Sequence, residues 1–210
     1  MTGSWTHFLA QAAILVPVFL ISVSFHEFCH AVVAFFLGDP TAKRAGRMTL
    51  NPLAHIDPLG VLFLIIFRIG WATPVPMNQN NFKYPRIYSV IAALAGPLSN
   101  LFLAITAFLT IKFFPVTLFS TAITATALQF FQALASVNIM LGVFNLFPIP
   151  PLDGSKVLFS ILGGRLAGFQ FLLERYGFFI IIGMIFLAPQ IVGSPICAAF
   201  NLLIPGACMH

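Results

Sequence analysis

Long runs without charge dominate the chain and predict membrane-spanning helices. A helix needs about 20 apolar residues to cross the hydrocarbon core of a bilayer. The first run continues past residue 25 to the helix-ending cluster Gly38-Asp39-Pro40, the third fits a helix over about 118–147, and the fourth ends before Pro189. We expect an all-α polytopic membrane protein with four spans, or five if 191–204 also crosses. The uncharged runs are 8–25, 88–111, 113–152 and 176–209.

A shorter apolar segment, 59–67, interrupts this pattern between Asp57-Pro58 and Arg68. Nine helical residues reach about 14 Å, which is half of the hydrocarbon core. Backbone that ends at such a depth must be packed on protein or line a cavity. We therefore expect a re-entrant or interfacial element at 59–67.

The basic residues are distributed asymmetrically around the predicted spans. If 59–67 does not cross, nine of them share one side of the membrane and Lys112 lies on the other. Because Lys and Arg accumulate in cytoplasmic loops, the shared side is expected to be cytoplasmic and the N-terminus outside. The nine are Lys43, Arg44, Arg47, Arg68, Lys83, Arg86, Lys156, Arg165 and Arg175.

The composition agrees with a chain that is solvated mostly by lipid. Apolar residues make up 60% and charged residues 7%, and the mean hydropathy is +1.01. Soluble domains carry about 25% charged residues, so a soluble or a disordered protein is excluded. The net charge of +5 rests on sparse basic residues and argues against a nucleic-acid partner. Three cysteines without paired spacing predict neither a disulfide framework nor a cysteine-based zinc site.

The candidate chemistry begins near the cytoplasmic end of the first predicted helix, at His26-Glu27-Phe28-Cys29-His30. Residues i and i+4 share a helix face, so both imidazoles can bind one metal ion. Glu27 lies one step round the helix and can reach a water molecule on that ion. Ionisable side chains inside a membrane are costly and usually functional. The alternative is a polar cluster whose hydrogen bonds hold helices together.

Two histidines leave a catalytic metal site one protein ligand short. Asp153 follows the third predicted span on a proline-rich loop. If 59–67 is re-entrant, this loop lies on the same side and near the same depth as the two histidines. Its rivals His55 and Asp57 could instead support a metal-bound histidine or merely shape a turn-rich loop. The full set of candidate ligands is Asp39, His55, Asp57, Asp153 and Glu174.

Four motifs together resemble the site-2 protease family of intramembrane zinc metalloproteases. The resemblance extends over about residues 15–165, and the combination of H-E-x-x-H with L-D-G is its most specific part. The motifs are His26-Glu27-Phe28-Cys29-His30 in the first span, NPLAHIDPLG at 51–60 after it, GPLSN at 96–100 in the next span and PLDG at 151–154 after the third.

The resemblance implies a site and a domain organisation. His26, His30 and Asp153 would bind one Zn²⁺ per chain, and Glu27 would be the general base. The substrates would be transmembrane helices cut inside the bilayer. Residues 1–210 would form a single intramembrane metalloprotease domain, with a core at about 8–165 and C-terminal helices at 166–210, as a short member without a PDZ or CBS domain.

Two amides and one loop are further candidates. Asn100 and Asn145 lie in apolar runs, where they either position substrate and stabilise an oxyanion or form hydrogen bonds between helices. Segment 70–78 alternates Pro74 and Pro76, which favours extended chain. Its edge could bind an unwound substrate by strand addition, or it could be an interfacial loop anchored by Trp71. Many relatives carry a basic residue where Thr73 stands.

The sequence therefore predicts an intramembrane zinc protease in the cell membrane, with its active site near the cytoplasmic side. Its expected partners are a transmembrane protein substrate and the lipid bilayer. The rival hypothesis is a metal transporter or metal-sensing membrane protein that uses the same ligands. A transporter needs ligands along a path through both halves of the membrane, whereas the outer half offers only His7 and His210 near the termini. A catalytically inactive scaffold is the third possibility, which an intact Glu27 disfavours.

Overall fold

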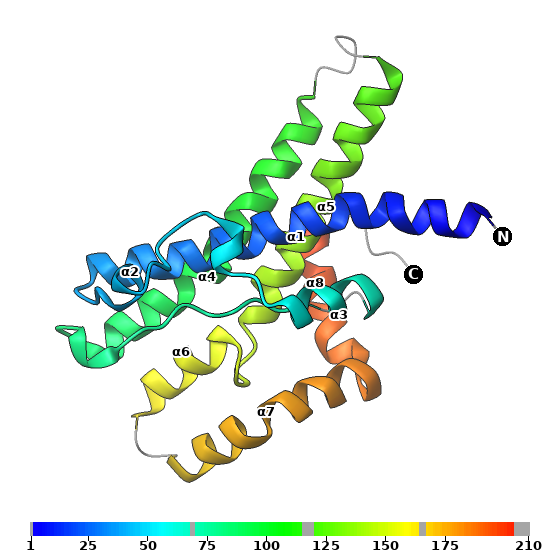
Figure 1. Ribbon diagram of the computed structural model, residues 1–210. Coiled ribbons are helices and arrows are strands. Elements are labelled where there is room, and N and C mark those ends of the chain that lie inside the picture. The colour runs from blue at the N-terminus through cyan, green and yellow to red at the C-terminus, as the bar shows by residue number, and fades with distance from the viewer. Residues whose placement is uncertain (1, 68–69, 115–119, 164–166, 204–210) are drawn as a thin grey trace.

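The computed structural model describes residues 2–67, 70–114, 120–163 and 167–203, and these are mostly helical (Figure 1). Arg68 and Arg165 lie outside the described residues. Four described helices are long and apolar enough to cross a membrane. This confirms the expected all-α polytopic membrane protein. The four are 8–36 within α1 (Thr2–Phe36), α4 (Pro85–Lys112), α5 (Thr121–Asn145) and α7 (Ala167–Leu187).

Helix α1 carries the H-E-x-x-H motif in its last turns and ends where the sequence predicts. Phe36 is its last residue, and Gly38 then adopts φ 107°, a left-handed conformation that favours glycine. A short helix, α2 (Thr41–Arg44), follows directly. The motif therefore lies about one and a half turns from the end of the span, and the polar loop starts just beyond it.

Helices α4 and α5 pair closely, and α1 packs across both of them (Figure 1). A Cβ on Gly142 of α5 would lie 3.0 Å from the side chain of Leu101 and 3.1 Å from the carbonyl oxygen of Pro97, both on α4. Small residues at such a position let two helices approach in a membrane, where no hydrophobic force drives them together. The three helices form the frame that holds the polar residues described below.

The loop between α1 and α4 contains a short helix and an extended segment. Helix α3 (Pro58–Phe67) has ten residues, too few to cross a bilayer, and it is preceded by the single turn η1 (Pro52–Ala54). Described residues 70–78 are extended, and Ile56 and Ala72 form one antiparallel bridge. A second single turn, η2 (Gln79–Asn81), leads to α4.

The C-terminal part differs from the expectation at two points. Asp153 does not lie on a loop but is the first residue of α6 (Asp153–Leu162), because the prolines before it end α5 without preventing a new helix. Helix α7 begins at Ala167, well before the uncharged run, and is followed by α8 (Pro189–Leu203). Cys197 of α8 is disulfide-bonded, which the spacing of the three cysteines does not indicate. Pairing depends on proximity in space, which spacing along the chain does not show.

The carboxylate of Asp39 connects the end of α1 to the extended segment. Asp39 is fully buried and accepts hydrogen bonds from the backbone N–H of Asn78 at 2.7 Å and from the side-chain amide of Asn81 at 2.7 Å. The backbone N–H and the hydroxyl of Thr41 also donate to it. Burial alone would raise the pKa of Asp39, but the bonds from Thr41, Asn81 and Asn78 outweigh burial and hold this pKa below its usual value.

Replacing Asp39 with Asn should destabilise the metal-free protein in a pH-dependent manner. Because folding lowers the pKa of Asp39, its stabilisation is present above the unfolded value of about 4 and is lost as the pH falls through the folded value. We expect a loss of about 1.5–3 kcal/mol at pH 7, the range for hydrogen bonds to a charged group. Unfolding midpoints of both proteins in detergent from pH 7 to pH 3 measure this. A difference that does not shrink below pH 4 would contradict it.

Candidate metal centre

Three side chains from two distant parts of the chain converge on one point. His26 and His30 lie one turn apart on α1, and their Nε2 atoms are 3.0 Å from each other. Oδ2 of Asp153, from the start of α6, lies 3.1 Å from Nε2 of His26 and 2.9 Å from Nε2 of His30. All three residues are buried. The structure thus brings together the three side chains that the sequence analysis predicts as metal ligands.

The other ring nitrogen of each histidine determines which lone pairs face the centre. Nδ1 of His30 lies 2.7 Å from the carbonyl oxygen of Ala92, which can only accept, so Nδ1 carries the proton. Nδ1 of His26 lies 2.5 Å from Oδ1 of Asn100, and the same argument applies. In the neutral rings both Nε2 atoms are therefore unprotonated and point at each other and at the carboxylate of Asp153.

This geometry fits a bound cation. Three lone pairs about 3 Å apart repel one another unless a positive charge lies between them. Around a tetrahedral zinc ion with ligand bonds of about 2.0–2.1 Å, neighbouring ligand atoms are roughly 3.3 Å apart. The observed spacing of 2.9–3.1 Å is slightly tighter than this. Two imidazoles and one carboxylate are a donor set typical of zinc, so these residues could hold that ion.

Asp153 is oriented by its own helix. Lys156, one turn along α6, donates from Nζ to Oδ1 of Asp153 at 2.8 Å, which leaves Oδ2 free to face the histidines. The carboxylate also lies at the N-terminal end of α6, where the helix dipole favours negative charge. A Cβ on Gly154 would overlap the carbonyl oxygen of Leu146. Glycine at this position therefore lets the first turn of α6 pack against the backbone that follows α5.

Glu27 lies beside the ligands and is held by the extended segment. Its Oε2 accepts a hydrogen bond from the backbone N–H of Val75 at 2.8 Å. Glu27 is 9% exposed, and it opens onto the same space as His26 and His30. A carboxylate in this place can exchange a proton with a water molecule at the centre.

A cavity of about 620 Å³ opens in front of the three ligands and Glu27. The extended segment lines it with Trp71, Pro74 and Val75, and α7 lines it with Phe178 and Ile182. Most of its walls are apolar, and its polar groups are concentrated at the metal centre. Helix α7 forms one side of the cavity. The structure describes all of its residues, 167–187, and Gly177 is the one that is buried.

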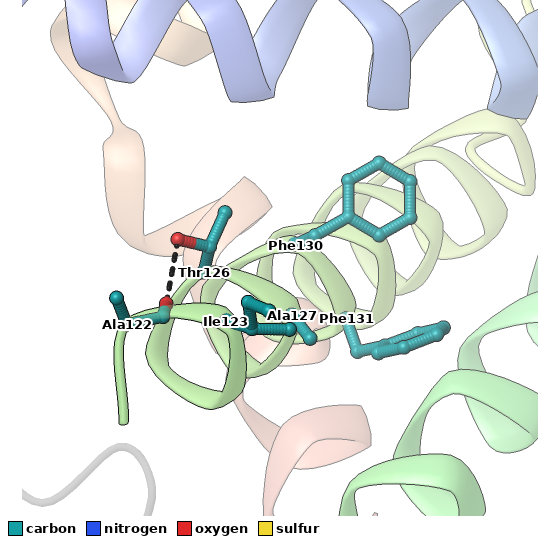
Figure 2. A pocket seen from close by; sticks show the side chains of 6 residues that line it. All are labelled: Ala122, Ile123, Thr126, Ala127, Phe130 and Phe131. Atoms are coloured by element: carbon teal, nitrogen blue, oxygen red, sulfur yellow. Dashed lines mark hydrogen bonds between the residues drawn. The ribbon is translucent and has the colours of Figure 1, made fainter. Parts of the chain in front are cut away.

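A separate hollow lies along the N-terminal part of α5 and has different chemistry (Figure 2). The hydroxyl of Thr126 donates to the backbone oxygen of Ala122 at 3.0 Å, which satisfies the one polar side chain drawn there. None of its lining side chains can bind a metal or transfer a proton at neutral pH, so the candidate chemistry belongs to the other cavity. The lining residues are Ala122, Ile123, Thr126, Ala127, Phe130 and Phe131.

The remaining predicted site residues lie in different surroundings. Asn145 lines the large cavity and donates to the backbone oxygen of Leu141 at 3.0 Å, whereas Asn100 is fully buried behind His26. His55 is buried and pairs with the backbone oxygen of Thr49 at 2.9 Å.

Asp57 accepts from the first backbone N–H groups of α3 and from the indole N–H of Trp71. These bonds tie the loop to the extended segment. They lower the pKa of Asp57, chiefly through Gly60 and Trp71. Support of a metal-bound histidine by His55 or Asp57 stays a prediction.

Two residues at the site escaped the sequence analysis. Asn138 is a third amide in an apolar run, and the argument applied to Asn100 would have found it. It donates to the hydroxyl of Ser22 at 2.8 Å and accepts from Asn100 at 2.7 Å. Gly96 is part of the GPLSN motif, and a Cβ there would overlap Nε2 of His30 and lie 2.5 Å from Nε2 of His26. Its lack of a side chain makes room for the metal-binding rings, which no local pattern reveals.

Comparisons with known proteins identify the family of the chain. The model of peptidase family M50 matches residues 14–187. "Putative zinc metalloprotease YwhC" of Bacillus subtilis (strain 168) is 39% identical over 177 residues, which cover 83% of this chain and 80% of that protein. "Putative zinc metalloprotease Rip2" of Mycolicibacterium smegmatis is 30% identical over 175 residues, which cover 80% and 65%. No solved structure gives a match. The chain therefore belongs to peptidase family M50, the site-2 protease family that its motifs resemble.

Proposed function

We propose that this protein is an intramembrane zinc metalloprotease that hydrolyses peptide bonds of transmembrane-helix substrates. The observation that carries the proposal is the triangle of His26, His30 and Asp153, with Glu27 beside it at the end of an apolar cavity. Membership of a peptidase family, with relatives named as zinc metalloproteases, supports the same reaction.

The roles of the residues follow from their positions. A zinc ion held by His26, His30 and Asp153 would lower the pKa of a water molecule and polarise the scissile carbonyl. Glu27 accepts the proton of the attacking water and returns it to the leaving amine. The hydrogen bond from Val75 holds one oxygen of Glu27, so the other is the oxygen that we assign to proton transfer. Asn145, on the cavity wall, is placed to contact substrate or the oxyanion.

The cavity indicates how a substrate would bind. A helical peptide bond is shielded by its own hydrogen bonds, so the substrate must unwind before it reaches the centre. The extended segment 70–78 runs along the cavity, and an unwound chain can add to such a segment as a strand. The apolar walls on α7 and at Trp71 suit the side chains of a transmembrane substrate.

We place the N-terminus outside and the active site near the cytoplasmic side of the cell membrane. Near the ends of α1, α4 and α5 that we assign to the inner side lie Lys43 of α2, Lys83 before α4 and Lys156 of α6, whereas Lys112 ends α4 on the opposite side. The metal-transporter hypothesis is not favoured, since the family is a peptidase family.

Glu27→Gln should abolish cleavage and leave zinc bound. Glutamine keeps the shape of the side chain but cannot accept the proton, and general acid–base catalysis contributes about 10²–10⁴-fold. Zinc per chain and cleavage of a transmembrane peptide in detergent are measured for both proteins. We expect zinc near one per chain in each and cleavage in the wild type alone. Unchanged cleavage by the variant would overturn the assignment of Glu27, and zinc binding without cleavage by the wild type would overturn the protease.

Gly96→Ala should weaken zinc binding by about tenfold or more, because the new methyl group would overlap the rings of both His30 and His26. Competition with a chromophoric chelator measures the affinity. Gly183→Ala of α7 is the matched control, since its Cβ would meet open space. Equal zinc affinities of the two variants would contradict the prediction.

The orientation can be tested with single cysteines in a background without the native ones. Phe113 follows α4 at its outer end and Tyr84 precedes α4 at its inner end, and both are exposed. An impermeant thiol reagent should label Phe113→Cys in intact cells and Tyr84→Cys only after lysis. The reverse pattern would place the N-terminus in the cytoplasm.

A further inference from the structure

A chain of buried amides extends from the metal centre into the helix bundle. Asn100 of α4 and Asn138 of α5 are both fully buried, and they lie behind His26 on the side away from the cavity. Neither is among the residues that line the cavity. Contact with substrate therefore does not explain why these two amides are buried here. Their hydrogen bonds indicate a different role.

The side-chain amide of Asn138, the one farther from His26, has a single possible orientation. Asn138 lies 2.8 Å from the backbone oxygen of Leu134, which accepts but cannot donate. The side-chain nitrogen of Asn138 must therefore face Leu134, and its oxygen must face Asn100. That oxygen lies 2.7 Å from the side-chain nitrogen of Asn100.

The orientation of Asn138 determines the orientation of Asn100. Nδ2 of Asn100 donates to Oδ1 of Asn138, and it also lies 3.3 Å from the backbone oxygen of Ser22. Oδ1 of Asn100 is thus directed at Nδ1 of His26, 2.5 Å away, and it requires a proton there. A neutral imidazole with its proton on Nδ1 has its lone pair on Nε2, the atom that faces Asp153 and His30.

We propose that Asn138 is a positioning residue that sets the metal-binding tautomer of His26 through Asn100. The proposal rests on the metal centre of the proposed function but not on proteolysis. A rotated amide of Asn100 would present N–H groups to Nδ1 of His26 and so place the ring proton on Nε2, where it competes with the metal. Asn138 prevents this rotation by anchoring the amide to an immobile backbone carbonyl.

The two histidines differ in this respect, which provides an internal comparison. The tautomer of His30 is set by the backbone oxygen of Ala92, which cannot rotate. The tautomer of His26 depends on a side-chain amide that can present either its oxygen or its nitrogen. One histidine therefore needs an orienting partner from α5, and the other does not.

The experiment measures the zinc affinity of the full-length, metal-free protein in detergent, by competition with a chromophoric chelator. Asn100→Leu removes the acceptor and should weaken zinc binding by about 10–100-fold. Asn138→Leu should weaken it by a smaller factor, about 3–10-fold, because the backbone oxygen of Ser22 still orients Asn100 in part. The double leucine variant should bind zinc as weakly as Asn100→Leu alone, since Asn138 acts only through Asn100.

A rescue variant separates orientation from packing. Both oxygens of an aspartate accept, so Asn100→Asp cannot present a donor to His26 in either orientation. Asn100→Asp combined with Asn138→Leu should therefore recover zinc affinity relative to Asn138→Leu. Ser22→Ala is the matched control: it removes one acceptor of Asn138 but leaves the bond to Leu134, so zinc affinity should stay within about twofold of wild type.

Several results would overturn the proposal. Factors that multiply in the double leucine variant would show that the two amides act independently. A loss in Ser22→Ala as large as that in Asn138→Leu would show that general packing is responsible. Unfolding midpoints of the metal-free proteins check that each variant folds. If the variant with Asn100→Asp does not fold, the comparison of the double leucine variant with the two single leucine variants still tests the proposal. Cleavage is not the readout, so a wild type that binds zinc without cleaving refutes the protease and leaves this inference intact.

Discussion

Three electron-pair donors face one another at the centre of an apolar helix bundle, and the rest of the structure makes this arrangement possible. Lone pairs about 3 Å apart are unfavourable without a cation, so each donor must be held in place by other bonds. Asn100 and the backbone oxygen of Ala92 hold the two imidazoles, and Lys156 holds the carboxylate. Inside a membrane no bulk water can substitute for these partners, so the polar groups form continuous networks between α1, α4, α5 and α6.

Close helix contacts are the second requirement, and glycine meets it at the positions where it matters. Gly96 leaves room for the imidazole rings between α1 and α4, and Gly142 brings α5 against α4. The amide of Asn138 reaches Asn100 because those two helices are so close. A membrane provides little hydrophobic force for helix association, so packing and hydrogen bonds between helices carry the stability of this core.

The extended segment 70–78 connects the catalytic side of α1 to the loop beyond it. Asp39 binds its C-terminal end at Asn78, Glu27 binds its middle at Val75, and Arg47 donates to the backbone oxygen of Thr73 at 2.6 Å. The same residues that fix the segment thus include the proposed general base. The extended segment and α7 form two walls of the cavity, and Gly177 is the one buried residue among 167–187 of α7.

The sequence by itself determined the membrane class, the four helices long enough to span a bilayer and the short apolar helix between the first two, because each depends on local hydrophobicity and length. It also indicated His26, Glu27 and His30, whose spacing is a property of one helix. For Asp153 the local sequence was not enough, because its distance from the histidines depends on how α1 and α5 are arranged in space. Only the tertiary structure placed Asp153 at a helix start, joined Cys197 in a disulfide, and showed the roles of Asn138 and Gly96. Those features result from contacts between helices far apart in the chain, and such contacts leave no periodic or local signal in the order of the residues.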